Sequence, residues 1–300
     1  MKITIIFNPI AGRRNPVSLA RAVQAFKAYD IDPVVKKTEK RGDAYHIALE
    51  AAQKGTETII AAGGDGTINE IANALVGSSS KLGILPMGVA NLFALEMQIP
   101  HDPTAAVDII VHGSPQQISP GYIQLQKEGG TGEILNHFLL MAGIGFDGGV
   151  LREIKRAHIA RWGKAAYVIT GARFLSKYTH SRLTIRIDQK ETLTASSAVV
   201  GKSRYYGGKF MVTPRASLKD DCLDLCVFKN KGTLSMIKYA CGVLTGNHLR
   251  HTGIYYAKAH ELEMSSSEEI YVQADGDFLG RLPARLGVTR DALSVMVPGI

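Results

Sequence analysis

Residues 57–75, ETIIAAGGDGTINEIANAL, decide the fold of this 300-residue chain. Thr58 to Ala62 form a run of β-branched and apolar residues bounded by glycines, which predicts a buried strand. A glycine turn with Asp65 at its centre follows, and after Thr67 apolar residues recur at helical spacing, at Ile68, Ile71, Ala72 and Leu75. The stretch therefore predicts a strand, a tight turn and a helix, with one carboxylate held at the turn.

The turn at Gly63, Gly64 and Gly66 has the chemistry of an anion site. Glycine lets backbone N–H groups approach a ligand closely, and the N-terminus of the next helix favours negative charge. A phosphate is the expected anion, and Asp65 would face its magnesium ion. The turn is not a Walker A loop, because Gly-Lys-Ser/Thr is absent, and its glycines are spaced more tightly than a dinucleotide fingerprint requires.

The composition is that of a soluble globular chain with an anionic partner. A length of 300 residues suits one large domain or two of ordinary size, and 45% hydrophobic and 21% charged residues are ordinary for a globular chain that buries a core. A net charge of +8 favours a nucleotide, a nucleic acid or an acidic membrane, but no nucleic-acid recognition motif accompanies it. The three cysteines lack zinc-finger spacing, so we expect a reduced, cytoplasmic protein.

Strands and helices alternate through the first third of the chain. Strands are predicted over Ile3–Phe7, Pro33–Lys37, Thr58–Ala62 and Leu82–Leu85, and helices over Val17–Tyr29, from Asp43, from Thr67, from Leu92 and over Pro103–His112. This alternation predicts a mostly parallel sheet covered on both faces, which binds ligands at the carboxyl ends of its strands. Those ends are followed by the turns Asn8–Gly12 and Pro86–Asn91 and by Thr38.

Further along the chain, strands are joined by hairpin-like turns. They are predicted over Gln117–Gln126, Ile134–Ala142, Leu183–Asp188, Leu193–Val200, Cys222–Phe228, Ile254–Ala259, Ile270–Ala274 and Leu279–Arg281, with a last strand over Ala292–Val297. The pattern predicts an antiparallel second lobe, a β-sandwich. A long helical region over residues 147–178 carries Arg156, Arg161 and Trp162, and is either a solvated basic helix face or a membrane-docking surface.

At the GGDG turn the sequence resembles the diacylglycerol kinase catalytic family, which includes sphingosine and ceramide kinases and soluble bacterial lipid kinases. NAD kinases and phosphofructokinases share this element more distantly. The resemblance extends over nearly the whole chain and implies two lobes. One is a nucleotide-binding α/β domain over residues 1–116, with a strand at about 289–300 returning to it. The other is a β-rich lipid-substrate domain over 117–288.

The resemblance implies an ATP site in the first lobe. Family members contact the nucleotide through an Asn-Pro-x-x-Gly turn, a threonine, the GGDG turn and a Pro-x-Gly-Thr-x-Asn turn. The implied ATP-binding residues are Asn8, Pro9, Gly12, Thr38, Gly63, Gly64, Asp65, Gly66, Thr67, Asn69, Glu70, Gly88 and Asn91. Glu70 could instead only complement the helix dipole. Val89 replaces the threonine of the last turn, and Leu92 stands where many members have an acid.

The stretch Gln273-Ala274-Asp275-Gly276-Asp277 resembles the family's Asp-Gly-Glu segment, whose glutamate is the proposed base for the lipid hydroxyl. The resemblance gives this role to Asp277, with Asp275 and Asp65 as the other catalytic carboxylates. The alternative is that the two neighbouring acids only form a hairpin turn.

The segment from Thr213 to Leu225 resembles one at which some bacterial members hold magnesium. The implied ligands are the carboxylate of Asp221 and the backbone carbonyls of Leu218 and Leu223, hard oxygen atoms that suit magnesium. The alternative is a polar turn. Cys222 stands where glycine is usual, so a positive φ would be strained there. Ser119 replaces a family aspartate, so that part of the family's metal–water network is not carried over.

We therefore expect an ATP-dependent, magnesium-requiring lipid kinase of phospholipid metabolism, acting on a diacylglycerol-like or sphingoid-like hydroxyl. One alternative is a soluble-substrate kinase of the NAD kinase type. Another is a catalytically silent nucleotide and lipid binder, which the substitutions at Val89, Leu92, Ser119 and Asp277 would favour. We expect a cytoplasmic protein that contacts anionic membranes peripherally and binds no nucleic acid. A homodimer stays open.

Overall fold

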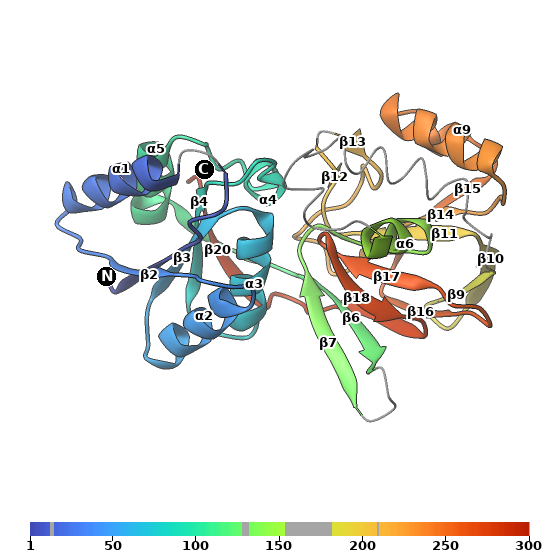
Figure 1. The fold of residues 1–300 in the computed structure, drawn as a ribbon, viewed down its shortest axis with the longest axis horizontal. Helices are drawn as coiled ribbons and strands as arrows, with labels where there is room; N and C mark the ends of the chain where they lie inside the picture. Colours follow the sequence, from blue (N-terminus) through green and yellow to red (C-terminus); the bar gives the residue numbers. More distant parts are fainter. Residues whose placement is uncertain (13–14, 128–131, 154–181, 209, 300) are drawn as a thin grey trace. The chain divides into compact units, whose positions relative to one another are not determined.

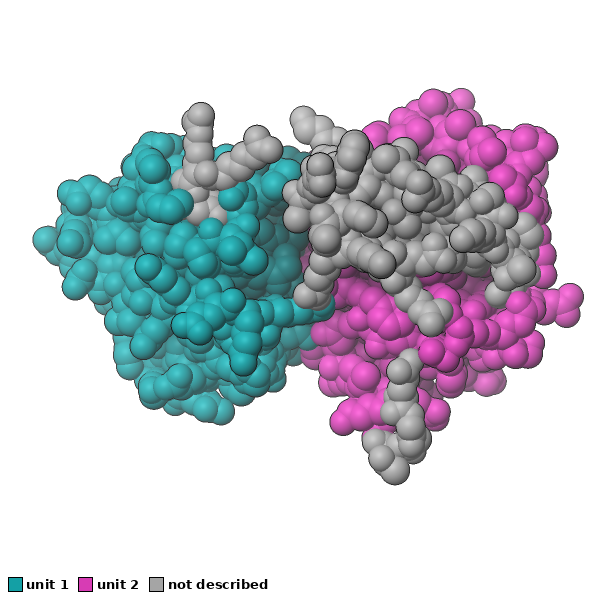
Figure 2. Space-filling view, in the orientation of Figure 1, with its two compact units in different colours: residues 1–120, 289–300 teal, residues 121–288 magenta. Residues whose placement is uncertain are grey.

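The computed structural model describes residues 1–12, 15–127, 132–153, 182–208 and 210–299 (Figure 1). The chain forms two compact units, drawn in different colours in Figure 2. The first unit contains Met1–Pro120 and Thr289–Ile300, and the second contains Gly121–Val288.

The first unit is built on a six-stranded sheet in the order β2-β1-β3-β4-β20-β5. Its strands are β1 (Ile3–Phe7), β2 (Val34–Lys37), β3 (Thr58–Gly63), β4 (Lys81–Pro86), β5 (Ser114–Ile118) and β20 (Leu293–Val297). All neighbours pair in parallel except β5, which is antiparallel to β20. Strands β1 and β3 are buried along their whole length, which is why they read as continuous apolar runs in the sequence.

Helices cover both faces of this sheet (Figure 1). They are α1 (Asn15–Lys27), α2 (Asp43–Gln53), α3 (Asp65–Leu75), α4 (Leu92–Glu96) and α5 (Pro103–His112). Helix α1 packs beside α5, and α2 packs beside α3. The apolar residues predicted to share one face of α3 are all buried: Ile68, Ile71, Ala72 and Leu75. The helix begins at Asp65, two residues before the predicted start.

The second unit contains two six-stranded sheets, ordered β10-β9-β16-β19-β6-β7 and β15-β14-β11-β8-β17-β18. The first comprises β6 (Gly121–Gln126), β7 (Glu133–Phe138), β9 (Leu183–Ile187), β10 (Glu191–Ala195), β16 (Glu261–Ser265) and β19 (Ala284–Val288). The second comprises β8 (Met141–Ile144), β11 (Ser197–Gly201), β14 (Leu223–Phe228), β15 (Ile254–Ala259), β17 (Tyr271–Ala274) and β18 (Asp277–Arg281). The other described elements of the unit are α6 (Phe146–Glu153), β12 (Tyr205–Tyr206), β13 (Phe210–Met211), α9 (Thr233–Leu244) and η1 (His248–Arg250).

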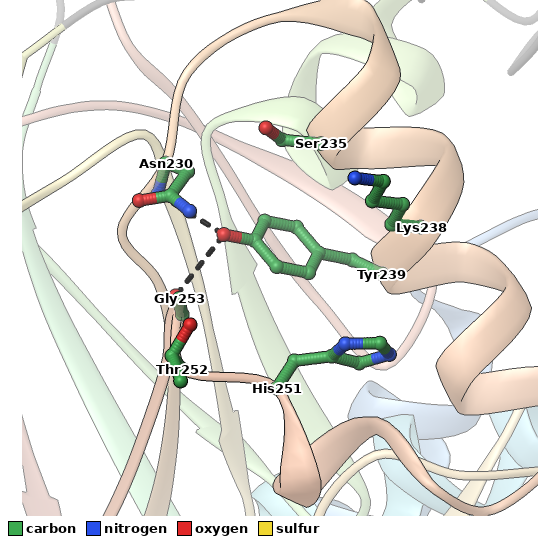
Figure 3. A pocket seen from close by; sticks show the side chains of 7 residues that line it. All are labelled: Asn230, Ser235, Lys238, Tyr239, His251, Thr252 and Gly253. Atoms are coloured by element: carbon green, nitrogen blue, oxygen red, sulfur yellow. Dashed lines mark hydrogen bonds between the residues drawn. The ribbon is translucent and has the colours of Figure 1, made fainter.

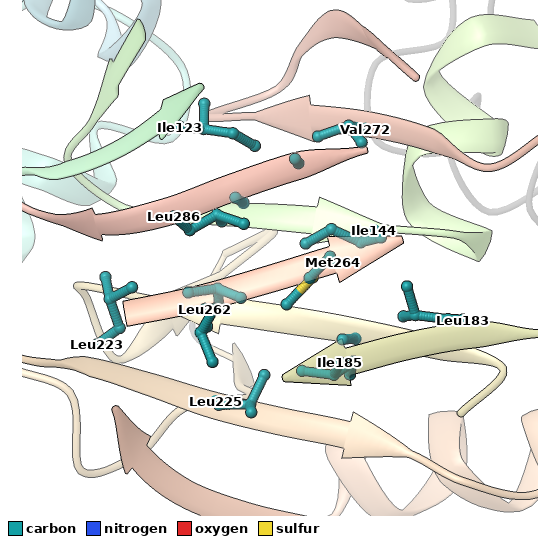
Figure 4. Close-up of a cluster of buried hydrophobic side chains, with 14 of the residues drawn as sticks. Ile123, Ile144, Leu183, Ile185, Leu223, Leu225, Leu262, Met264, Val272 and Leu286 are labelled. Carbon is teal, nitrogen blue, oxygen red and sulfur yellow. The ribbon is translucent and has the colours of Figure 1, made fainter. Parts of the chain in front are cut away.

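Alternate side chains of both sheets form one apolar core (Figure 4). Strand β9 contributes Leu183, Ile185 and Ile187. The other sheet contributes Leu223, Leu225 and Val227 of β14 among others. Two antiparallel sheets that share such a core are a β-sandwich. The predicted fold class, a mostly parallel α/β lobe followed by an antiparallel β-sandwich, is confirmed.

Three predicted strands are each two strands in the structure, so these predictions were wrong. The predicted strand 117–126 is divided between β5 and β6, which belong to different sheets. Pro120 lies between them, and proline has no N–H to continue a ladder. Similarly, 134–142 is divided into β7 and β8, and 193–200 into β10 and β11. In both cases the chain leaves one sheet of the sandwich and enters the other.

Strands β16 and β19 and helix α9 are present in the structure but were not predicted from the sequence. Strand β16 alternates Glu261 and Glu263 with buried Leu262 and Met264 over only five residues, too short for a strong signal. Helix α9 carries apolar residues on its outer face as well, which hides the helical period.

The predicted helical region over 147–178 begins as α6, and its part beyond residue 153, including Arg156, Arg161 and Trp162, lies outside the described residues. Among the described helices, none is long and apolar enough to cross a bilayer.

Candidate active site

The loops expected to bind ATP leave one edge of the first unit's sheet. Strands β1 to β4 run parallel, so the loops that follow them emerge at their shared carboxyl edge, where open α/β sheets bind ligands. Backbone N–H groups join neighbouring loops: Thr38 N donates to Phe7 O at 3.0 Å, Asn8 N to Ala62 O at 3.0 Å and Met87 N to Gly63 O at 2.8 Å. The sheet thereby brings four distant segments of the sequence together.

Asn8 holds its turn through its side chain. Its Oδ1 accepts a hydrogen bond from the N–H of Ile10 at 3.1 Å, as in an Asx turn. Its Nδ2 donates to the hydroxyl of Thr67 at 3.0 Å. The Asn-Pro turn is therefore fixed to the first turn of α3, the helix that follows the GGDG stretch.

Gly64 and Gly88 bring the loops after β3 and β4 into backbone contact. A Cβ on Gly88 would lie 2.5 Å from the Cα of Gly64 and 2.7 Å from Oδ1 of Asn91, so no other residue fits without a shift. Asn91 is buried, and its side chain exchanges two hydrogen bonds with the backbone of Gly88, at 2.8 and 3.0 Å. Asn91 thus shapes this turn.

Asp65 opens helix α3 and is partly buried. Its Oδ1 accepts a hydrogen bond from the N–H of Phe93 at 3.0 Å, which ties the GGDG turn to α4. No donor among the described residues reaches its Oδ2. This oxygen can therefore face a cation, so the carboxylate fits the predicted role beside a magnesium–phosphate group.

Glu70 has a hydrogen-bond partner in a distant segment, and Asn69 has one in its own helix. The Oε1 of Glu70 accepts from the N–H of Gly42 at 3.0 Å, at the start of α2. Asn69 accepts from the side-chain amide of Asn73, one helical turn later. Glu70 therefore braces the loop that follows Thr38.

Two apolar side chains are highly exposed on the neighbouring loops, Ile10 at 87% and Val89 at 84%. At position 89 the loop presents a methyl surface instead of the family's hydroxyl.

In the second unit, Asp275 and Gly276 form the two-residue turn between β17 and β18. Their φ angles are 48° and 86°, as a type I′ hairpin turn requires. The carboxylate of Asp275 accepts three backbone hydrogen bonds, from Leu139 N at 2.7 Å, Leu140 N at 2.9 Å and Met141 N at 2.9 Å. Asp275 therefore fixes the connection between β7 and β8.

Asp277 begins β18, pairs with Ala274 across the hairpin and is partly buried. A polar network that the sequence analysis missed supports this hairpin. Gln273 accepts from the N–H of Gly276 at 3.0 Å and donates to Asp147 at 2.5 Å, and the Tyr206 hydroxyl donates to Asp147 at 2.7 Å. Burial raises the pKa of the Asp147 carboxyl. A Cβ on Gly143 would lie 2.1 Å from Oδ2 of Asp147, so the glycine at this position leaves the space that the Asp147 carboxylate occupies.

The segment predicted to bind magnesium already holds an ammonium group. Lys202 is fully buried, and its Nζ donates to the backbone carbonyls of Asp220 at 2.6 Å and Cys222 at 3.1 Å. Burial lowers the pKa of Lys202 to about 8. Cys222 is not among the described residues with positive φ, so the strain expected there is absent. No sequence pattern distinguished this buried lysine from a surface one.

The predicted metal ligands differ in their exposure. Asp221 is exposed, whereas Leu218 and Leu223 are buried residues that could offer only their carbonyls. The carbonyl of Asp221 faces Nδ1 of His260 at 3.3 Å. Ser119, at the position of the missing family acid, is buried and accepts a hydrogen bond from the N–H of Asp291 at 3.0 Å, within the first unit.

Comparisons with known proteins agree with this organisation. Residues 2–123 match the diacylglycerol kinase catalytic domain, and residues 141–297 match the YegS C-terminal NAD kinase beta sandwich-like domain. A diacylglycerol kinase of Bacillus subtilis is 30% identical over 302 residues, covering 98% of this chain and 95% of that protein. One of Mycobacterium tuberculosis is 30% identical over 303 residues, covering 99% and 95%.

Solved structures share the fold. A crystal structure of a putative diacylglycerol kinase from Bacillus anthracis has a TM-score of 0.79 at 22% identity, covering 99% of this chain and 96% of that one. Yeast NADH kinase complexed with NADH has a TM-score of 0.55 at 10% identity, covering 99% and 83%. The family models and the curated relatives, together with this fold, thus define the class as a kinase with an NAD kinase-like architecture.

The chain belongs to the diacylglycerol kinase catalytic family. The family resemblance inferred from the GGDG turn is confirmed, and so is the expected enzyme class, a lipid kinase.

Proposed function

We propose that this protein transfers the γ-phosphoryl group of ATP to a hydroxyl group of a membrane lipid, with a diacylglycerol-like acceptor preferred over a sphingoid base. The observation that carries the nucleotide part is the meeting of four loops at the carboxyl edge of the parallel sheet, with Gly64 and Gly88 in backbone contact. The names of the relatives from Bacillus subtilis and Mycobacterium tuberculosis support the acceptor.

Phosphoryl transfer needs alignment and charge neutralisation more than covalent chemistry. In the proposed site, the Asn8–Gly12 and Gly63–Thr67 turns hold the phosphates through backbone N–H groups and through the positive end of α3. Of the remaining proposed ATP contacts, Thr38, Gly88 and Asn91 lie on the loops after β2 and β4, and Asn69 and Glu70 lie in α3. Magnesium, when bound, would neutralise phosphate charge, and Asp65 is the residue that would hold it.

Asp277 is the proposed base for the acceptor hydroxyl. A base must come within about 2.6–3.2 Å of the proton it removes, directly or through one water. The carboxylate of Asp275 already accepts three backbone hydrogen bonds, so its proposed role is to position the hairpin. Asp277 would then be the residue that accepts the proton. Asp147 and Gln273 would hold the hairpin from its other side.

A magnesium ion at Asp221 would be structural and would bind the same segment whose carbonyls accept hydrogen bonds from the Lys202 ammonium. This segment also carries Asp220, which is paired with Lys258. The cation supplied by Lys202 leaves the fold of the segment less dependent on a metal. We therefore keep Leu218, Asp221 and Leu223 as a proposed site that adds to the lysine contacts.

Incubation of the protein with radiolabelled ATP, magnesium and total cell lipid tests the proposal. The expected result is one labelled phospholipid, made more slowly by Asp277→Asn. A panel of purified diacylglycerol, sphingosine, ceramide and NAD then identifies the acceptor. Labelling of NAD alone would show that the protein is a soluble-substrate kinase. The absence of any ATP turnover would show that it is a catalytically silent nucleotide and lipid binder.

A cytoplasmic protein with this activity must reach its acceptor at a membrane surface. The sequence suggested the basic residues Arg156 and Arg161 with Trp162 as one such surface. Sedimentation with anionic vesicles at low and high salt tests this, because salt screens surface charge. A homodimer remains a separate proposal, which analytical ultracentrifugation tests.

A further inference from the structure

Helix α9 presents an apolar face to solvent. The exposed fractions are 67% for Leu234, 45% for Ile237 and 59% for Leu244, and Cys241 is exposed between them. Residues three and four positions apart lie on the same side of a helix, so these four form one stripe. The opposite side is buried in the second unit through Met236, Tyr239 and Gly242. The helix is therefore apolar on both sides, and within the described part of the chain only one side is covered.

Tyr239 fixes this helix firmly to the unit (Figure 3). Its hydroxyl donates to the carbonyl of Gly253 at 3.1 Å and accepts from the N–H of Asn230 at 3.2 Å. Its ring lies 5.2 Å from the ring of Phe228. The outer stripe of α9 is thus held in place as a surface. Strand β13 packs next to the helix and adds the exposed side chains of Phe210 and Met211.

The chain segment that carries the stripe is basic. Residues 229–252 contain no Asp or Glu, and they contain the cations Lys229, Lys231, Lys238 and Arg250. Such a segment repels other cations and attracts an anionic surface. An apolar helix face edged by lysine and arginine is the pattern of helices that lie in the interface of anionic membranes.

Three residues of α9, Ser235, Lys238 and Tyr239, also line a polar pocket of about 180 Å³ (Figure 3). Its lining includes Ser235, Lys238, His251 and Thr252. Lys238 is one helical turn from Leu234, so it borders the apolar stripe and the pocket at once. An ammonium group with hydroxyl groups beside it suits a phosphate, the group that every phospholipid presents at the surface of a bilayer.

We propose that α9 is a membrane-docking element that binds an anionic phospholipid bilayer. Leu234, Ile237 and Leu244 enter the interface, and Lys238 with its pocket receives a lipid phosphate. The assignment rests on the proposed function, because a lipid acceptor lies in a bilayer. It adds a second candidate surface, built from described residues of the second unit, to the one suggested by Arg156, Arg161 and Trp162.

Cys241 gives a direct test. It is the exposed cysteine of the three, since Cys222 and Cys226 are buried, so a thiol-reactive, polarity-sensitive fluorophore labels the centre of the stripe. Vesicles of equimolar phosphatidylcholine and phosphatidylglycerol should shift its emission to the blue. Pure phosphatidylcholine vesicles should not. An unchanged spectrum with the anionic vesicles would overturn the proposal.

Sedimentation of the full chain with the same vesicles measures the contribution of each feature. Leu234→Ser/Ile237→Ser/Leu244→Ser should weaken binding at least about tenfold, and Lys231→Gln and Lys238→Gln about fivefold each. The matched controls are Leu135→Ser, an equally exposed leucine on β7, and Lys190→Gln, an exposed lysine in the turn after β9. Binding by the triple variant within twofold of wild type would overturn the proposal.

Two further readouts separate the other outcomes. Every variant should phosphorylate lipid dispersed in detergent micelles as wild type does, since α9 carries no proposed catalytic residue. If the variants are active on micelles and also bind vesicles as wild type does, the docking proposal is wrong and the proposed function stands. If vesicle binding depends on α9 but no lipid is phosphorylated, the docking proposal stands and the proposed function is wrong. If the triple variant changes only the oligomeric state, the stripe joins two copies of the chain, and docking is wrong.

Discussion

The side-chain amide of Asn8 donates a hydrogen bond to the hydroxyl of Thr67 at 3.0 Å, joining two turns that are 59 residues apart in the sequence. Thr67 lies in the first turn of α3, and Asn8 follows β1 directly. The two turns proposed to hold the phosphates are therefore one connected structure. Moving either turn should disturb the other.

A double-mutant cycle tests this connection. Asn8→Ala and Thr67→Val should each raise the KM for ATP, and the double variant should cost less than the sum of the two. A hydrogen bond of this kind contributes about 0.5–1.5 kcal/mol, and contacting residues couple by a similar amount. Initial rates at varied ATP give the three values. Strictly additive changes would show that the two turns act independently.

Asp65→Asn separates the two roles of Asp65. The amide oxygen of asparagine can still accept from the N–H of Phe93, so the fold should stay near wild type, whereas the loss of charge should lower kcat at least about a hundredfold. Asp65→Ala also removes the acceptor and should cost a further 1–3 kcal/mol of unfolding free energy, roughly. Urea unfolding and turnover, measured in parallel, distinguish the two effects. Normal turnover by folded Asp65→Asn would move the site elsewhere.

The two acids of the β17–β18 hairpin should respond differently. Asp277→Asn should lower kcat by roughly 10²–10⁴ with little change in ATP affinity or Tm, because it removes the proposed base and keeps the size. Asp277→Glu, which restores the usual family residue, should stay active. Asp275→Ala leaves three backbone N–H groups without their acceptor and should lower the unfolding free energy by at least about 3 kcal/mol. Full activity in Asp277→Asn would assign the proton transfer to another group.

Lys202 should make stability depend on alkaline pH. Its pKa falls from 10.5 to about 8 on folding, so between these values the unfolded chain binds more protons than the folded one, and stability rises with pH. Relative to Lys202→Met, which cannot titrate, the wild type should gain about 2 kcal/mol between pH 8 and pH 10. Urea unfolding at the two pH values measures this. A constant difference would mean that the ammonium keeps its ordinary pKa.

Nucleotide-free protein tests the proposed metal at Asp221. If magnesium binds there, it should raise the Tm of the wild type, since a ligand at 100 times its Kd stabilises the folded state by about 2.7 kcal/mol. Asp221→Asn should abolish that rise, whereas Asp65→Asn should leave it intact. Equal Tm values with magnesium and with a chelator would show that the Lys202 contacts alone hold this segment.

The sequence by itself determined the features that depend on neighbours in the chain. Continuous apolar runs predicted the buried strands β1 and β3, the 3.6-residue period predicted α3, and glycines at Gly63, Gly64 and Gly66 predicted a turn fit for phosphate. The alternation of such elements was enough to predict an α/β lobe followed by a β-sandwich. Each of these signals is local, because periodicity and backbone freedom act over a few residues.

Only the tertiary structure decided which polar groups meet. The donors that bind Asp275 are 134 to 136 residues away in the sequence, and the carbonyls that bind Lys202 are about 20 residues away in another segment. The outer stripe of α9 looks like core in the sequence, yet its side chains are exposed, and none of the described elements covers them. Composition says that a side chain is apolar or charged, but its burial and its partner depend on packing between distant segments, which a local pattern does not contain.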